Sequence, residues 1–84
     1  MNLLTEKEIA AVQAVLAEEL GVKPEQLKPE AHLEADLGAD SLTKVEIVMG
    51  LEDRLAVTLT DEATEKVQTV EDVYEAVARG LGRN

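Results

Sequence analysis

Apolar residues recur at helical spacing along most of this chain, and no segment shows the sustained alternation of a β-strand. After Thr5 they lie three or four positions apart, at Ile9, Val12, Leu16 and Leu20. Thr5-Glu6-Lys7-Glu8 has the pattern of a capping box, and Gly21 is well placed to end a helix. These features predict a first helix over about residues 5–20.

Two more helices are expected in the middle of the chain. Asp40 is a good N-cap for a helix over about residues 41–55. Asp61 can cap a short third helix that reaches about Val67. Isolated extended runs between them are too short to build a sheet.

The last helix has signals at both of its ends. Thr69 can cap it, with Asp72 at the third helical position, and Gly80 and Gly82 end it. Its apolar stripe consists of Val70, Val73, Tyr74 and Val77.

A long connection over residues 22–39 separates the first two helices. Pro24 and Pro29 punctuate it, and residues 23–27 can form one short turn. We expect four apolar residues to pin it to the core, namely Val22, Leu27, Leu33 and Leu37. The predicted class is therefore all-α, a small four-helix bundle with three long helices, one short helix and a long loop between helices 1 and 2. Residues 1–84 are expected to form a single domain.

The charge balance excludes several classes of partner. Eighteen acidic against eight basic residues give a net charge of −10. Such a surface repels nucleic acid and anionic membranes and suits a partner with a basic patch, although acidity that serves solubility alone is the open alternative. There is no cysteine, His32 is the one histidine, and no apolar run approaches membrane-spanning length. We expect a cytoplasmic protein without membrane insertion.

The second helix has two apolar faces. One consists of Ile47, Val48, Leu51 and Leu55 and suits the core. The other consists of Leu42, Val45 and Met49, interleaved with Glu46 and Asp53. Simple exposure of three apolar side chains is one explanation. We favour a docking face, an apolar patch among carboxylates that meets a groove edged with Lys or Arg.

Ser41 stands at the start of this helix, and three roles for it are possible. A catalytic nucleophile needs a general base, and His32 has no evident orienting partner. As a helix cap it competes with Asp40. As a phosphoryl attachment point it is well placed, because a helix N-terminus favours anions. A calcium-binding EF-hand loop starting at Asp36 is excluded, since its sixth position is Ser41 and its twelfth is Ile47.

These residues carry a resemblance to a known family. Asp36-Leu37-Gly38-Ala39-Asp40-Ser41-Leu42, continuing as Val45-Glu46-Ile47-Val48-Met49, resembles the attachment motif of acyl carrier proteins of the bacterial fatty-acid-synthesis type. Leu20-Gly21-Val22-Lys23, Leu33-Glu34 and Asp61-Glu62 fit the same family, and the likeness spans essentially the whole chain.

The resemblance implies a carrier rather than an enzyme. Ser41 would accept 4′-phosphopantetheine from coenzyme A through a separate phosphopantetheinyl transferase. The carrier would then deliver acyl thioesters to fatty acid synthase enzymes with basic docking patches, or to a polyketide or other specialised pathway. It would act as a monomer. The partner-binding residues implied by the resemblance are Asp40, Leu42, Val45, Glu46 and Met49, with Glu52 and Asp53 extending the acidic surface.

The family also implies an interior that shelters the acyl chain. Lys44 stands where fatty-acid carriers often have a small polar residue. Its ammonium group either reaches solvent, or pairs with the prosthetic phosphate, or narrows the mouth of the pocket. Tyr74 is expected to border this pocket, and Gly50 to allow close helix packing or a bend. No metal site is expected.

Overall fold

The computed structural model describes residues 3–83. They form α1 (Glu6–Leu20), the 3-10 helix η1 (Pro24–Gln26), α2 (Ser41–Leu55), α3 (Asp61–Glu65) and α4 (Val70–Gly80), with no strand among them. The predicted all-α class, with three long helices, one short helix and a long loop after the first, is confirmed. Within this described part, no helix is both long enough and apolar enough to cross a membrane.

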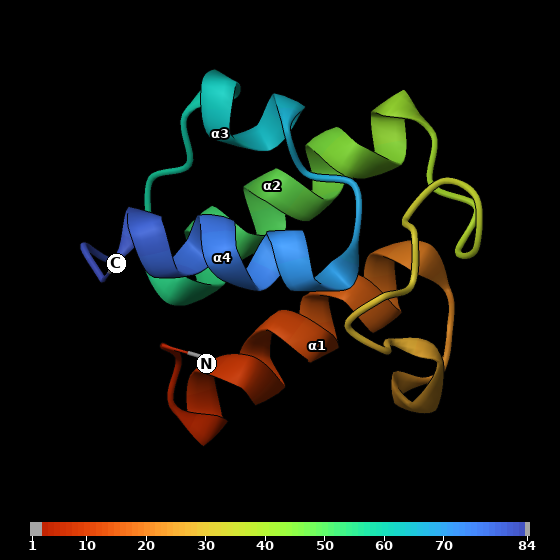
Figure 1. The fold of residues 1–84 in the computed structure, drawn as a ribbon, viewed down its shortest axis with the longest axis horizontal. Coiled ribbons are helices and arrows are strands. Elements are labelled where there is room, and N and C mark those ends of the chain that lie inside the picture. The colour runs from red at the N-terminus through yellow and green to blue at the C-terminus, as the bar shows by residue number, and fades with distance from the viewer. Residues whose placement is uncertain (1–2, 84) are drawn as a thin grey trace.

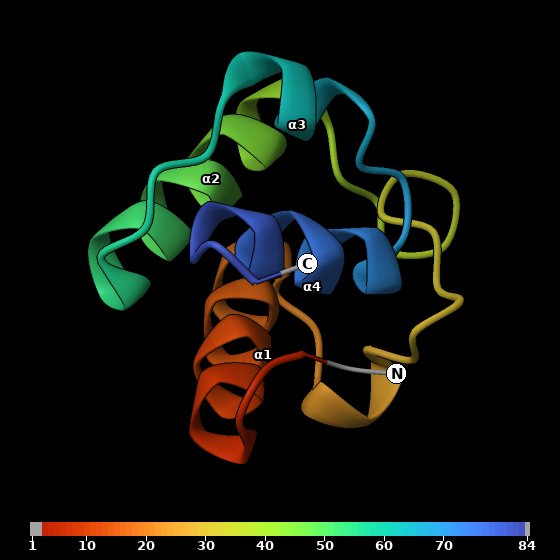
Figure 2. The ribbon, with the colours of Figure 1, turned by 60° about the vertical axis from the view of Figure 1, so that its left-hand side comes forward.

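The three long helices pack around one core, and α3 lies on the side of α2 and α4 away from α1 (Figures 1 and 2). Helices α1 and α2 approach closely at Gly50, where an added Cβ would lie 3.0 Å from Val15 Cγ1. Close packing, one of the two roles expected for Gly50, is therefore observed. Between α1 and α4, Gln13 Nε2 donates a hydrogen bond of 3.2 Å to the hydroxyl of Tyr74.

The ends of α1 and α2 follow their local sequence signals. Thr5 and Glu8 form the predicted capping box of α1, and Gly21 ends the helix with a left-handed φ of 66°. Asp40 is the N-cap of α2, as predicted.

Helix α4 also begins as predicted. Thr69 and Asp72 form a capping box. Gly80 is the last residue of the helix, and Gly82 beyond it has a positive φ of 80°. All four residues of the predicted apolar stripe are buried, namely Val70, Val73, Tyr74 and Val77.

The predicted start and end of α3 are wrong. Its N-cap is Thr60, whose Oγ1 accepts the N–H of Ala63 at 3.1 Å, and Asp61 is already the first helical residue. The helix ends at Glu65 rather than near Val67. Threonine and aspartate are both good N-caps, so the sequence alone does not decide which of the adjacent residues Thr60 and Asp61 caps the helix. Asp61 instead lies in the first turn of α3, where its negative charge interacts favourably with the positive end of the helix dipole.

The long connection is pinned to the core as expected. Leu27, Leu33 and Leu37 are buried, and Val22 packs against the core while partly exposed. The connection also pairs with the segment before α4, since the N–H of Leu33 donates to Gln68 O at 2.8 Å and the N–H of Val70 donates to Ala31 O at 3.0 Å. These bonds fix the path of the chain as it approaches α2.

Candidate functional site

Ser41 is the first residue of α2, and its side chain is exposed. The N-cap role belongs to Asp40, whose Oδ1 accepts hydrogen bonds of 2.8 Å from both the N–H and the Oγ1–H of Thr43. These bonds lower the pKa of Asp40, so its carboxylate stays charged at neutral pH. Because Asp40 caps α2, the Ser41 hydroxyl is not needed as a helix cap. Ser41 is also the only serine of the sequence.

A cavity of about 350 Å³ begins beside Ser41 and lies between α2, α3 and α4. Buried apolar side chains form much of its wall, namely Leu33, Ile47, Leu51, Leu59, Val73 and Ala76. Ser41, Met49, Asp61 and Glu65 also line it and are exposed, so the cavity opens to the surface between α2 and α3. Because Ser41 itself lines this cavity, a group attached there has direct access to an apolar interior.

Sequence reasoning placed Tyr74 at this pocket, and that prediction is wrong. Tyr74 does not line the cavity, and its hydroxyl meets Gln13 of α1 instead. The contribution of α3, including Thr64 and Glu65, was not foreseen. These residues reach the cavity because α3 packs beside α2 and α4. Their spacing in the sequence does not indicate where α3 packs.

The second apolar stripe of α2 faces outward, as predicted. Leu42, Val45 and Met49 are 68%, 53% and 63% exposed, while Ile47 and Leu51 on the other face are buried. Asp40, Glu46 and Asp53 are exposed as well. The helix thus presents apolar side chains together with carboxylates.

Glu52 has a different environment from the other acidic residues of α2. It is partly buried, and its Oε2 accepts the N–H of Leu59 at 2.9 Å. Its carboxylate therefore holds the turn between α2 and α3, whose Leu59 is part of the cavity wall. This contact gives Glu52 a structural role that its helical position alone did not reveal.

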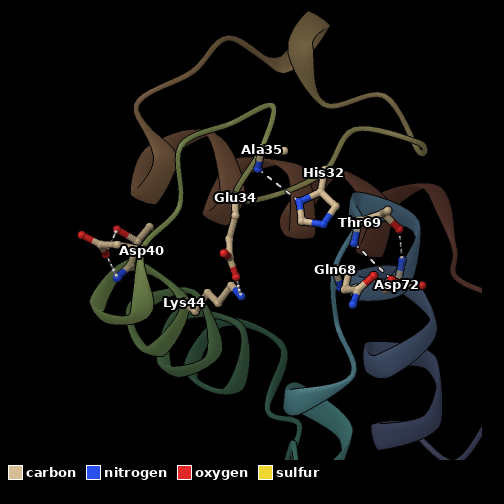
Figure 3. Close-up of polar contacts among 9 residues, drawn as sticks. His32, Glu34, Ala35, Asp40, Lys44, Gln68, Thr69 and Asp72 are labelled. Carbon is tan, nitrogen blue, oxygen red and sulfur yellow. Dashed lines mark hydrogen bonds and ion pairs between the residues drawn. The ribbon is translucent and has the colours of Figure 1, made fainter.

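His32 makes two hydrogen bonds within the long connection. Its Nδ1 accepts the backbone N–H of Ala35 at 3.1 Å, and the backbone N–H of His32 donates to Asp36 Oδ2 at 2.8 Å. Figure 3 shows the imidazole beside Thr69, with Glu34 between it and the start of α2. Neither of these two bonds involves Ser41.

Lys44 lines the cavity one turn after Ser41, and its Nζ pairs with Glu34 Oε1 (Figure 3). This hydrogen-bonded ion pair lowers the pKa of Glu34 below its ordinary value. Sequence reasoning considered three roles for Lys44 but missed Glu34 as its partner. The two residues are ten positions apart, across a loop whose path only the tertiary structure defines.

Comparison with known proteins agrees with this geometry. The family described as "Phosphopantetheine attachment site" matches residues 10–77. A curated relative named acyl carrier protein, from Thermosynechococcus vestitus, is 46% identical over 66 residues, which cover 79% of this chain and 82% of the relative. Members of this family hold a covalently attached phosphopantetheine and are carriers rather than enzymes. By both comparisons, the chain belongs to the acyl carrier protein family.

Proposed function

We propose that Ser41 is the attachment residue for 4′-phosphopantetheine and that this chain carries acyl groups to enzymes of fatty acid biosynthesis. The observation that carries the proposal is the position of Ser41. It is an exposed hydroxyl that also lines an apolar cavity, at the start of a helix with an exposed apolar stripe.

The residues present fit the prosthetic group. The Ser41 hydroxyl would lose its proton and form a phosphodiester with the pantetheine phosphate of coenzyme A, whose pyrophosphate bond breaks to release adenosine 3′,5′-bisphosphate. The positive end of the α2 dipole favours the phosphate. When bound, the group supplies a thiol that holds an acyl chain as a thioester, which suits a chain that has no cysteine of its own. The buried wall of the cavity offers aliphatic surface to the chain.

Burial of the cargo in this cavity is moderately favourable. Each methylene removed from water contributes about 0.8 kcal/mol, before the cost of widening the core. A few methylenes therefore hold the cargo inside, while the pocket of a partner enzyme can still compete for it. A carrier needs this balance, because it must both protect and release its cargo.

The exposed face of α2 is proposed as the partner-binding surface. It combines Leu42, Val45 and Met49 with the carboxylates of Asp40, Glu46 and Asp53, and Glu52 borders it. With a net charge of −10, long-range attraction would steer the carrier toward the basic patches of the transferase and of the synthase enzymes. Binding would then bury the apolar stripe.

A specialised acyl carrier, for a polyketide or another lipid pathway, is the second candidate. The observation that favours it is the polar part of the cavity lining, where Lys44 and Thr64 stand among aliphatic residues. Incubation with each pathway's acyl-transferring enzyme separates the two candidates, since the correct one loads its acyl group faster.

The attachment itself is tested by mass spectrometry. Apo protein is incubated with coenzyme A and a phosphopantetheinyl transferase, and the proposal expects one phosphopantetheine adduct on the wild type and none on Ser41→Ala. Thr43→Val, which removes the hydroxyl two residues away, is the matched control and should still be modified. An unmodified wild type, or an equally modified Ser41→Ala variant, would refute the assignment.

A further inference from the structure

Lys44 and Glu34 meet at the part of the cavity that adjoins Ser41. Ser41 and Lys44 are one turn apart on α2, and both line the cavity. Glu34 follows Leu33, which lines the cavity from the long connection. Figure 3 shows that the ion pair joins α2 to the connection, and its Lys44 member lines the cavity.

Hydrogen bonds fix the backbone at Glu34. Its carbonyl accepts the N–H of Gly38 at 3.1 Å, which closes a turn around it. The neighbouring Leu33 is held through Gln68 at 2.8 Å and through the N–H of Ala39, which donates to Leu33 O at 2.8 Å. Lys44 has the longer side chain of the pair, because four methylenes separate its charge from the backbone of α2.

The long stem of Lys44 has an apolar use here. A lysine buries its methylenes along apolar surface while the ammonium stays near water. Lys44 lines the cavity with a side chain that is 34% exposed, and its charge reaches a Glu34 side chain that is 57% exposed. Lys44 thus lines the cavity while its ammonium group pairs with a carboxylate at the surface.

We propose that Lys44 is a specificity-determining residue: Glu34 holds it so that its stem closes part of the cavity and limits the length of the acyl chain that enters. This inference rests on the proposed function, because it requires an acyl-phosphopantetheine arm on Ser41. An ion pair this exposed is weak and exchanges readily. The stem can therefore move aside when a partner loads or withdraws the cargo.

The test uses the full chain, to which a phosphopantetheinyl transferase has transferred acyl-phosphopantetheine from acyl-coenzyme A, with release of adenosine 3′,5′-bisphosphate. The saturated acyl groups are of increasing length. Thermal unfolding of each acyl form is compared with that of the unacylated holo form. Each further methylene that enters the cavity should raise Tm by about 3–6 °C. Tm stops rising at the chain length beyond which no more methylenes are buried.

Two variants and a control are compared with the wild type. Lys44→Ala removes both the stem and the pair, and Tm should keep rising to longer chains. Glu34→Gln removes only the pairing charge and should move this limit in the same direction, by less. Lys66→Ala is the control, because Lys66 pairs with Glu62 at 3.8 Å on exposed surface outside the cavity lining and should leave the limit unchanged.

The outcomes separate this inference from the proposed function. If mass spectrometry finds no acyl-phosphopantetheine on Ser41 in the wild type, the proposed function fails. If all variants load but share one length limit, the role of Lys44 is refuted while the carrier function stands. A limit that moves in Lys44→Ala alone overturns the role of the pair. Glu34 is an exposed loop residue, so Glu34→Gln remains informative even if Lys44→Ala destabilises α2.

Discussion

Replacing Gly80 by alanine tests how tightly α4 packs against the segment that follows α2. An added Cβ would lie 2.4 Å from Val57 Cγ2, 3.1 Å from Thr58 O and 3.2 Å from Leu59 Cδ2. Carbon atoms prefer separations of about 3.5–4.0 Å. Both Val57 and Leu59 are buried, and one contact is with backbone, so rotation of a single side chain does not relieve the overlap.

The size of the effect follows from two opposing contributions. Overpacking costs about 1–3 kcal/mol, and the gain in helix propensity from Gly to Ala is at most about 1 kcal/mol. Gly80 is the last residue of α4, so this gain is small there. Gly80→Ala should therefore lower the free energy of unfolding by about 1–3 kcal/mol and Tm by about 4–24 °C.

Urea and thermal unfolding of the apo protein measure this change. Gly50→Ala is the matched control, because its Cβ would meet only Val15 side-chain atoms, the nearest at 3.0 Å, and it gains helix propensity in mid-helix. Its free energy of unfolding should stay within about 1 kcal/mol of the wild type. A Gly80→Ala variant as stable as the wild type, or less affected than Gly50→Ala, would refute the packing argument.

Two further predictions concern the chain ends and the exposed face of α2. Arg83 forms a hydrogen-bonded ion pair with Glu8. This bond, together with the hydrogen bond from the backbone N–H of Thr5, lowers the pKa of Glu8 to about 2. A carboxyl group whose pKa is lowered by folding stabilises the protein at pH values above its unfolded-state pKa, so wild-type Tm should fall as the pH is lowered from about 5 to about 2. This fall should be less steep in Arg83→Gln than in the control Arg79→Gln. Equal dependence of Tm on pH in the two variants would contradict the assignment. Leu42→Ala and Met49→Ala should each change the free energy of unfolding by at most about 0.5 kcal/mol, yet together they should lower kcat/KM of the transferase by about tenfold or more. Leu3 is exposed outside α2, so the control Leu3→Ala should leave kcat/KM unchanged. An unchanged kcat/KM in the Leu42→Ala, Met49→Ala double variant would exclude α2 as the docking face.

Features whose partners are close in sequence could be predicted. Thr5, Asp40 and Thr69 each bind a backbone N–H three residues ahead, so their caps were visible in the sequence. The two faces of α2 followed from helical periodicity for the same reason. At α3 the local signal was ambiguous, because Thr60 and Asp61 are adjacent and both suit an N-cap.

Features that depend on the path of the chain could not be predicted. The pairing of Lys44 with Glu34 needs the turn that Gly38 closes, and the contact of Glu52 with Leu59 needs the turn after α2. Tyr74 was correctly assigned to the buried face of α4 but to the wrong neighbour. That face is wide enough to contact both α1 and the cavity, and periodicity alone does not divide it.

The central claim is that Ser41 carries the prosthetic arm and its acyl cargo in the cell. The most direct test is mass spectrometry of the intact protein purified from its native host, followed by fragmentation of the peptide that contains Ser41. We expect phosphopantetheine on Ser41, part of it bearing an acyl group whose mass identifies the pathway. A protein without the arm, or with the modification on another residue, would contradict it.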